Sequence, residues 1–253
     1  MKKLKITIKE DYADNYDNYI FDLYGTIVDI HTDESKASLW KDIAMFYSLQ
    51  GASYDAKEFK AKYMSLCEKE VKALPGRDDE VEIDIKNVFK KLFEDKLVSP
   101  SETLVNDAEL MFRAASLKYI KLYPKALKTL KELQKRGKKL YLLSNAHADF
   151  TIPELKYLEI YNIFDKIYIS SECGYKKPSK EFMDKLIKEE KLNVGRSIMI
   201  GNSLEDDIEV AKRCKMDSFF IKSNISPKED NLSESTATYS FPMKNAYKAL
   251  LSI

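Results

Sequence analysis

Residues 18–26 read NYIFDLYGT. A short apolar run is followed directly by Asp22, and then by a leucine, a tyrosine, a glycine and a threonine. An apolar run of this length with turn residues directly behind it is typical of a strand buried on both faces of a parallel sheet. Similar runs follow in the second half of the chain, at residues 139–143, 166–169, 197–200 and 218–221. Amphipathic segments with helical spacing lie between them. This alternation predicts an α/β fold, with a doubly wound parallel sheet and helices on both of its faces.

Residues 31–118, between the first strand and the rest of the predicted sheet, show helical patterns only. Apolar side chains recur there at a spacing of three or four residues, and glycine, proline and serine residues separate the segments. The clearest apolar face contains Ile85, Val88, Phe89, Leu92 and Phe93. We therefore expect a core made of residues 1–30 and 119–253, with residues 31–118 as an inserted α-helical domain. Residues 239–241 are expected to add an edge strand before a short last helix.

The composition describes a soluble protein and excludes several classes of function. The 42 basic and 41 acidic residues give a net charge of +1, which produces no field to attract nucleic acid or an anionic membrane. No run approaches the roughly 18 apolar residues of a spanning helix, and the first residues do not resemble a secretory signal. The 3 cysteines lie far apart, which fits a reducing cytoplasm, and the 7 glycines form no Gly-rich phosphate loop. We expect a cytoplasmic protein that binds a small molecule, while its oligomeric state is not predicted.

Polar side chains follow the predicted strands at the sheet edge where open α/β sheets bind ligands. They are Asp22 after the first strand, Ser144 and Asn145 after the second, Lys177 after the third, and residues 201–207 (GNSLEDD) after the fourth. At this edge, Asp22 is suited to attack an electrophile and form a covalent ester or acyl phosphate. Lys177 and Ser144 would hold an anion there. Asp22 and Asp207 would supply the oxygen ligands that Mg²⁺ prefers.

Four segments in this order resemble the motifs of the haloacid dehalogenase-like hydrolase superfamily. They are residues 21–29 (FDLYGTIVD), Ser144-Asn145, Lys177-Pro178 and residues 201–208 (GNSLEDDI). The helical insert after the first motif is similar to the cap domain of that superfamily, most of whose members are phosphatases of small metabolites. The resemblance implies that Asp22 is the nucleophile and that Lys177 neutralises the transferring group. It also implies that Thr26, Ser144 and Asn145 support this group, and that Asp22, the Tyr24 carbonyl and Asp207 bind metal.

Two positions depart from the pattern of the family's phosphatases. Those enzymes carry a second aspartate two residues after the nucleophile, which protonates the leaving oxygen, and this chain has Tyr24 there. General acid catalysis is worth roughly 10²–10⁴-fold, and a phenol with its usual pKa of about 10 replaces the aspartate poorly. Asn202 stands where the first aspartate of the fourth motif is usual, so one negative charge near a bound cation is missing. The sequence leaves open whether Asp206 or Asp207 faces the site.

We therefore expect a Mg²⁺-dependent phosphatase that forms an aspartyl phosphate and is limited to activated substrates. A metal-independent 2-haloacid dehalogenase is one alternative, because those enzymes carry a tyrosine at the position of Tyr24 and halide leaves without a proton. The first predicted helix of the insert lacks the arginine that they use, and Arg77 and Arg113 are the arginines of the insert. A non-catalytic protein that binds a phosphorylated ligand is the other alternative. His147 is expected to be a polar surface residue rather than a base.

Overall fold

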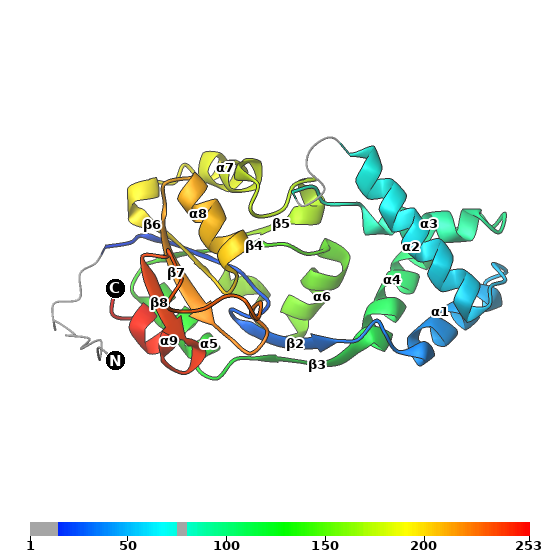
Figure 1. The fold of residues 1–253 in the computed structure, drawn as a ribbon, viewed down its shortest axis with the longest axis horizontal. Helices are drawn as coiled ribbons and strands as arrows, with labels where there is room; N and C mark the ends of the chain where they lie inside the picture. The colour runs from blue at the N-terminus through cyan, green and yellow to red at the C-terminus, as the bar shows by residue number, and fades with distance from the viewer. Residues whose placement is uncertain (1–14, 75–79) are drawn as a thin grey trace.

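The computed structural model describes residues 15–74 and 80–253 (Figure 1). Its main sheet has six parallel strands in the order β5-β4-β1-β6-β7-β8. The strands are β1 (Asn18–Phe21), β4 (Lys139–Ser144), β5 (Lys166–Ile169), β6 (Ser197–Gly201), β7 (Asp217–Lys222) and β8 (Tyr239–Pro242). After β5 the chain returns to the other side of β1 to form β6, so the strand order reverses beside β1. Open α/β sheets bind ligands at such a reversal point.

Helices cover both faces of this sheet, as the sequence predicts. They are α5 (Ala126–Lys135), α6 (Ala148–Tyr157), α7 (Lys180–Glu189), α8 (Glu209–Arg213) and α9 (Met243–Leu250). Side chains of β1 alternate between the faces: Tyr19 and Phe21 pack in one hydrophobic cluster with α5 and α9, and Ile20 packs in another with α7 and α8. Single helical turns connect these elements at Tyr161–Ile163, Ser170–Glu172 and Val194–Arg196, and a π-helical turn spans Leu204–Ile208. The predicted doubly wound fold, the edge strand and the last helix are confirmed.

Four helices form a separate domain, which we call the cap, at the opposite end of the molecule from α5 and α9 (Figure 1). They are α1 (Ala37–Leu49), α2 (Ala56–Ala73), α3 (Ile85–Glu94) and α4 (Glu102–Ser116). They pack around buried aromatic rings, among which Tyr47 and Phe93 stack with centroids 3.9 Å apart. Asp55 and Ser101 accept hydrogen bonds from backbone N–H groups in the first turns of α2 and α4. The helices expected from the sequence are therefore present.

The prediction of helices alone for residues 31–118 is wrong at both ends of this segment. The antiparallel strands β2 (Val28–Thr32) and β3 (Leu117–Leu122) form a two-stranded ribbon between the core and the cap. Across the ribbon, the hydroxyl of Tyr119 donates to Asp29, and the ring of Tyr119 stacks on that of His31. The pairing joins residues about 90 positions apart, so no local sequence pattern predicts it. None of the helices within residues 15–74 and 80–253 combines the length and apolar character needed to cross a membrane.

Candidate active site

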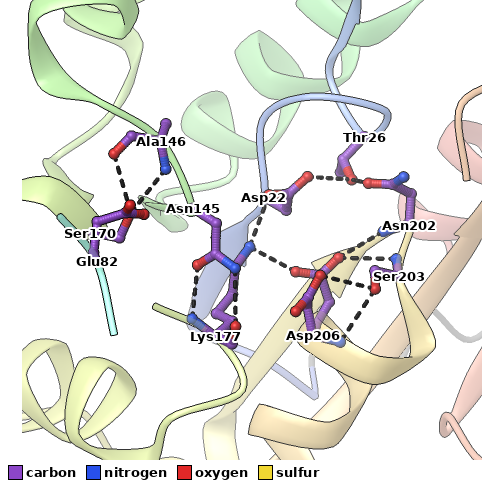
Figure 2. A network of polar contacts seen from close by, with 11 residues as sticks. Asp22, Thr26, Glu82, Asn145, Ala146, Ser170, Lys177, Asn202, Ser203 and Asp206 are labelled. Atoms are coloured by element: carbon purple, nitrogen blue, oxygen red, sulfur yellow. Dashed lines mark hydrogen bonds and ion pairs between the residues drawn. The ribbon is translucent and has the colours of Figure 1, made fainter. Parts of the chain in front are cut away.

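Three charged side chains meet at the carboxyl end of β1 (Figure 2). Lys177 Nζ lies 2.8 Å from Asp22 Oδ1 and 2.6 Å from Asp207 Oδ1, and its side chain is 1% exposed. Burial alone would lower the pKa of Lys177, but the charges of Asp207 and Asp22 outweigh burial and raise it. Burial raises the pKa of Asp22 to about 6, although the charge of Lys177 acts in the opposite direction. At neutral pH the ammonium is therefore charged and Asp22 is mostly ionised, as a nucleophile must be.

Asn145 fixes the backbone of Lys177 from both sides. Its Oδ1 accepts a hydrogen bond from the Lys177 N–H at 2.7 Å, and its Nδ2 donates to the Lys177 carbonyl at 2.9 Å. The next peptide bond, Lys177–Pro178, is cis, and Arg213 donates to the Pro178 carbonyl at 2.9 Å. Asn145 thus positions the lysine, and its role in substrate binding stays a prediction.

Asp207, rather than Asp206, faces Lys177. Asp207 Oδ2 accepts hydrogen bonds from the backbone N–H groups of Asn202 at 2.9 Å and Ser203 at 3.0 Å. This close fit requires a glycine at position 201, where a Cβ would lie 2.1 Å from the Asp207 carboxyl group. The Asp206 carboxylate instead accepts from the Ser203 hydroxyl at 3.1 Å. Within the described part of the chain, the hydrogen-bond partners of Asp207 are all donors of the protein itself, so its role as a metal ligand stays a prediction.

Two hydroxyl groups flank the charged cluster. Thr26 Oγ1 donates to Asp22 Oδ2 at 3.1 Å, which leaves the nucleophile held at both oxygens. Ser144, at the end of the neighbouring strand β4, is fully buried, and its Oγ has no hydrogen-bond partner in the described part of the chain. Buried polar atoms without a partner are rare in native proteins, so this hydroxyl is available to a ligand.

The orientation of the Asn202 amide determines whether the predicted metal ligands accept hydrogen bonds from the protein or are left for a cation. The amide end that faces β1 lies 2.8 Å from the Tyr24 carbonyl oxygen and 3.2 Å from Asp22 Oδ2. With the nitrogen at this end, Asn202 donates to both oxygens and the site is complete without a cation. With the amide oxygen at this end, the Asn202 amide oxygen lies at roughly 3 Å from the Tyr24 carbonyl oxygen and from Asp22 Oδ2. This is the spacing of adjacent ligands in an octahedral Mg²⁺ site. The donor set therefore fits Mg²⁺ in one amide orientation.

Gly25 makes this approach of Asn202 possible. Its φ of 87° lies in the left-handed region, and a Cβ at this position would lie 2.3 Å from the Asn202 amide. The described residues contain no cluster of three or more His, Cys, Asp or Glu side chains that could hold a metal ion. A Mg²⁺ site here would therefore need a backbone carbonyl and an amide oxygen beside the Asp22 carboxylate, with Asp207 as a further predicted ligand.

The hydroxyl of Tyr24 is bound to a pair of charged residues that sequence reasoning did not find. It donates to Glu154 Oε2 at 2.6 Å, and Arg113 of the cap helix α4 holds the same carboxylate through Nε at 2.5 Å and Nη2 at 3.3 Å. Burial, and then the charge of Glu154, raise the pKa of Tyr24 above its ordinary value. The phenol is therefore a poor proton donor at neutral pH. Together these three side chains connect the cap to the core.

A cleft of about 330 Å³ lies between the cap and the core and adjoins Tyr24 and Asn145. His147 lines this cleft, and 23% of its side chain is exposed. Burial lowers the pKa of His147, and its Nδ1 has no hydrogen-bond partner among the described residues. Its position three residues after Ser144 indicated that it lies near the site. The side of the cleft that the cap forms could not be predicted from sequence. Arg77, the other arginine of the insert, lies outside the described residues.

Comparisons with known proteins agree with this architecture. A family model described as a haloacid dehalogenase-like hydrolase matches residues 16–215. A glyceraldehyde 3-phosphate phosphatase of Methanothermobacter thermautotrophicus is 27% identical over 107 residues, 42% of this chain and 47% of that protein. A ribulose-1,5-bisphosphate 5-phosphatase of Halopiger xanaduensis is 27% identical over 95 residues, 38% of this chain and 40% of that protein. The chain thus spans about half the length of the curated relatives it matches, or less.

Two solved structures share the fold over nearly their whole length. A 2-haloacid dehalogenase from Pseudomonas syringae superposes with a TM-score of 0.65 at 14% identity, over 93% of this chain and 98% of that chain. A hydrolase from Bacillus subtilis bound to magnesium superposes with a TM-score of 0.54 at 18% identity, over 94% of this chain and 100% of that chain. At these identities the likeness concerns the fold alone.

Proposed function

The chain belongs to the haloacid dehalogenase-like hydrolases, and within that family we propose that it is a Mg²⁺-dependent phosphatase of a small phosphorylated metabolite. The observation that carries this proposal is the ion pair of 2.8 Å between Asp22 and the buried Lys177, beside the hydroxyl of Ser144, which has no hydrogen-bond partner among residues 15–74 and 80–253. A carboxylate nucleophile, a fixed cation and a free hydroxyl donor form a site for a phosphoryl group. The sugar-phosphate phosphatases among the relatives support the same reading.

The reaction proceeds in two displacements at phosphorus. A carboxylate oxygen of Asp22 forms a bond to phosphorus, and the bond from phosphorus to the leaving oxygen breaks with its electron pair going to the leaving group. Water then attacks the phosphorus of the aspartyl phosphate and gives a proton to the solvent. The bond to Asp22 breaks with its electron pair returning to the carboxylate, and inorganic phosphate leaves. Lys177 and Ser144 donate to the phosphoryl oxygens in both steps. Mg²⁺ would be held by Asp22, the Tyr24 carbonyl and Asn202, with Asp207 beside them, and would neutralise phosphate charge.

The position of Tyr24 limits the substrates that this site can process. Its hydroxyl is engaged by Glu154, and its raised pKa makes it a weak acid. A leaving group therefore departs without a proton from this position, which favours acyl and aryl phosphates over alkyl esters. A metal-independent 2-haloacid dehalogenase is the second candidate, since the Asn202 amide nitrogen can satisfy the Tyr24 and Asp22 oxygens without a cation. A non-catalytic phosphate-binding protein is the third.

One experiment separates these candidates. Purified wild type, Asp22→Asn and the surface control Asp42→Asn on α1 are assayed for phosphate release from acetyl phosphate, with Mg²⁺ and with EDTA. We expect Mg²⁺-dependent turnover by the wild type and the control, and none by Asp22→Asn. Chloride release from 2-chloropropionate that resists EDTA would instead identify a dehalogenase. Thermal stabilisation by inorganic phosphate without any product would identify a binding protein.

A further inference from the structure

The cleft between the cap and the core lies where the leaving group of a substrate would sit. It is lined by Tyr24, which lies two residues after Asp22 in the chain, and by Asn145, which directly follows Ser144. A phosphate bound at Asp22 therefore directs the remainder of its substrate into this space. The chemistry of the cleft walls then selects the substrate, an inference that rests on the proposed phosphatase function.

Aromatic and aliphatic side chains form much of the cleft wall. Tyr63, Ile85 and Phe112 line it from the cap, and Tyr24 and Phe150 line it from the core. At about 330 Å³ the cleft is at the small end of the range for sites that enclose a small molecule. Aromatic walls gain most from a flat apolar ligand, which stacks on them or meets their edges. A three-carbon sugar offers no such surface.

The charges in the cleft are unfavourable for an anion. Arg113 is the cation among the described lining residues, apart from His147, and its Nε and Nη2 are both bound to Glu154. Glu34 adds a negative charge at the wall, and its backbone carbonyl accepts a hydrogen bond from Trp40 Nε1 at 2.8 Å. A second phosphate or a carboxylate in the cleft would find no unpaired positive charge, and a buried anion without a partner is costly.

His147 is one of the polar residues that line the cleft, together with Thr32, Asn145 and Thr151. Its Nδ1 is buried and has no partner in the described part of the chain, although the ring lines the cleft. A neutral imidazole donates or accepts one hydrogen bond at this atom, according to its tautomer. A neutral polar group on the ligand would satisfy it.

We propose that the cleft selects a leaving group that has a flat ring and no negative charge, so that the substrate is an aryl phosphate rather than a bisphosphate or a phosphorylated carboxylic acid. This class also suits Tyr24, because a phenolate with a pKa of about 10 leaves more readily than an alkoxide. The cleft and the missing acid therefore favour the same chemical class.

Binding of non-hydrolysable phosphonates tests this proposal without turnover. Calorimetry gives the affinities of phenylphosphonate, propylphosphonate and 4-carboxyphenylphosphonate for the wild type, Glu34→Lys and Asp42→Lys. For the wild type we expect phenylphosphonate to bind about tenfold more tightly than propylphosphonate, and the carboxylated compound to bind about tenfold more weakly than phenylphosphonate. Glu34→Lys should remove this discrimination against the carboxylate. Asp42→Lys makes the same charge change on the exposed side of α1 and should keep it.

Three results would overturn the proposal. These are equal or tighter binding of the carboxylated compound by the wild type, equal binding of the phenyl and propyl compounds, and the same behaviour of both lysine variants. Acetyl phosphate turnover by the wild type reports the phosphatase function separately. If acetyl phosphate is not hydrolysed while the phosphonates rank as expected, the proposed function fails and the selectivity of the cleft stands.

Discussion

The site at the strand ends and the cleft beside it satisfy their polar groups in different ways. At the strand ends, the charges of Asp22, Lys177 and Asp207 are paired with each other and held by backbone N–H groups and by Thr26. In the cleft, aromatic side chains share the wall with polar ones, and His147 Nδ1 has no partner among the described residues. The first arrangement is preorganised for a charged reacting group, and the second keeps hydrogen-bonding capacity for a ligand. In the proposed function, reaction therefore takes place at the strand ends of the core, and selection takes place in a cleft that the core and the cap line together.

The strongest test of this contrast is the removal of the central cation. Lys177→Met leaves two buried carboxylates without their shared partner, and we expect turnover of acetyl phosphate to fall by about 10²–10³-fold. The free energy of unfolding should also fall, by about 3–5 kcal/mol, because breaking a buried ion pair leaves uncompensated charge. Lys176→Met, one residue earlier, should change neither quantity. Activity assays and urea denaturation measure both.

A second variant separates catalysis from folding at this site. Lys177→Met combined with Asp207→Asn removes one of the unpaired charges, so part of the lost stability should return while activity stays low. If the double variant recovered turnover together with stability, Lys177 would be a structural residue. The contrast between a reacting site and a selecting cleft would then disappear.

Tyr24 stands at the boundary between the two regions, and its replacement has the next largest expected effect. Tyr24→Asp places a carboxylic acid where the family's phosphatases carry one. Because general acid catalysis is worth roughly 10²–10⁴-fold, we expect kcat for an alkyl ester such as glycerol phosphate to rise by about 10²-fold. Turnover of acetyl phosphate, whose leaving group needs no proton, should not rise. Steady-state kinetics on both substrates provide the measurement.

Tyr24→Phe is the matched control, since it keeps the ring and loses only the hydroxyl with its hydrogen bonds to Glu154 and Thr151. It should bring no gain on glycerol phosphate. Equal gains in the two variants would mean that release of the contact between Tyr24 and Glu154, and not a proton donor, limits the reaction.

The strand-end site could be predicted from sequence because its residues lie at the ends of strands or in the loops that follow them. Asp22 follows β1, Ser144 ends β4, and Lys177 lies in the loop after β5. The parallel sheet brings such positions together regardless of the cap. The choice between Asp206 and Asp207 could not be read, because it depends on which carboxylate reaches the backbone N–H groups of the same turn. Both side chains are acidic and adjacent, so only the backbone geometry distinguishes them.

The cleft was much less predictable. The contact of Arg113 with Glu154 joins residues 41 positions apart in different domains, and neither residue belongs to a recognisable pattern. The part of the cleft wall that the cap contributes opposite His147 could not be predicted, because the cap had no predicted position. Contacts of this kind depend on how the ribbon of β2 and β3 places the cap, and that pairing is itself long-range.

Asn202 offers a smaller and more specific test of the strand-end site. Asn202→Asp adds a negative charge beside Asp22 and the Tyr24 carbonyl, and affinity for a hard cation rises with ligand charge. We expect the Mg²⁺ concentration for half-maximal activity to fall by about tenfold, with about 1.4 kcal/mol of added binding free energy. Titration of EDTA-treated protein with Mg²⁺ measures this. Asn231→Asp, on an exposed loop, is the control, and an unchanged Mg²⁺ requirement in Asn202→Asp would exclude this amide as a ligand.

The last expected effect concerns stability and not activity, and it lies in the cap. Glu109 of α4 is 0% exposed, and neither of its carboxylate oxygens has a hydrogen-bond partner in the described part of the chain. Burial raises the pKa of Glu109 to about 8 from an ordinary value of 4.5. The negative charges of Asp149 and Asp84 also raise this pKa, and the positive charge of Lys86 lowers it. The folded cap therefore keeps a proton that the unfolded chain releases.

Between about pH 4.5 and 8, this difference should make the protein less stable as pH rises, by up to about 1.4 kcal/mol per pH unit, with no further loss above that window. Glu109→Gln cannot ionise, so its stability relative to wild type should increase steadily from pH 5.5 to pH 7.5 in urea denaturation. Asp107→Asn, on the exposed face of the same helix, should follow the wild type at each pH. Parallel curves for wild type and Glu109→Gln would mean that Glu109 is ionised in the folded cap. An uncompensated charge would then lie behind the cleft, and the cap would share the charged character of the strand-end site.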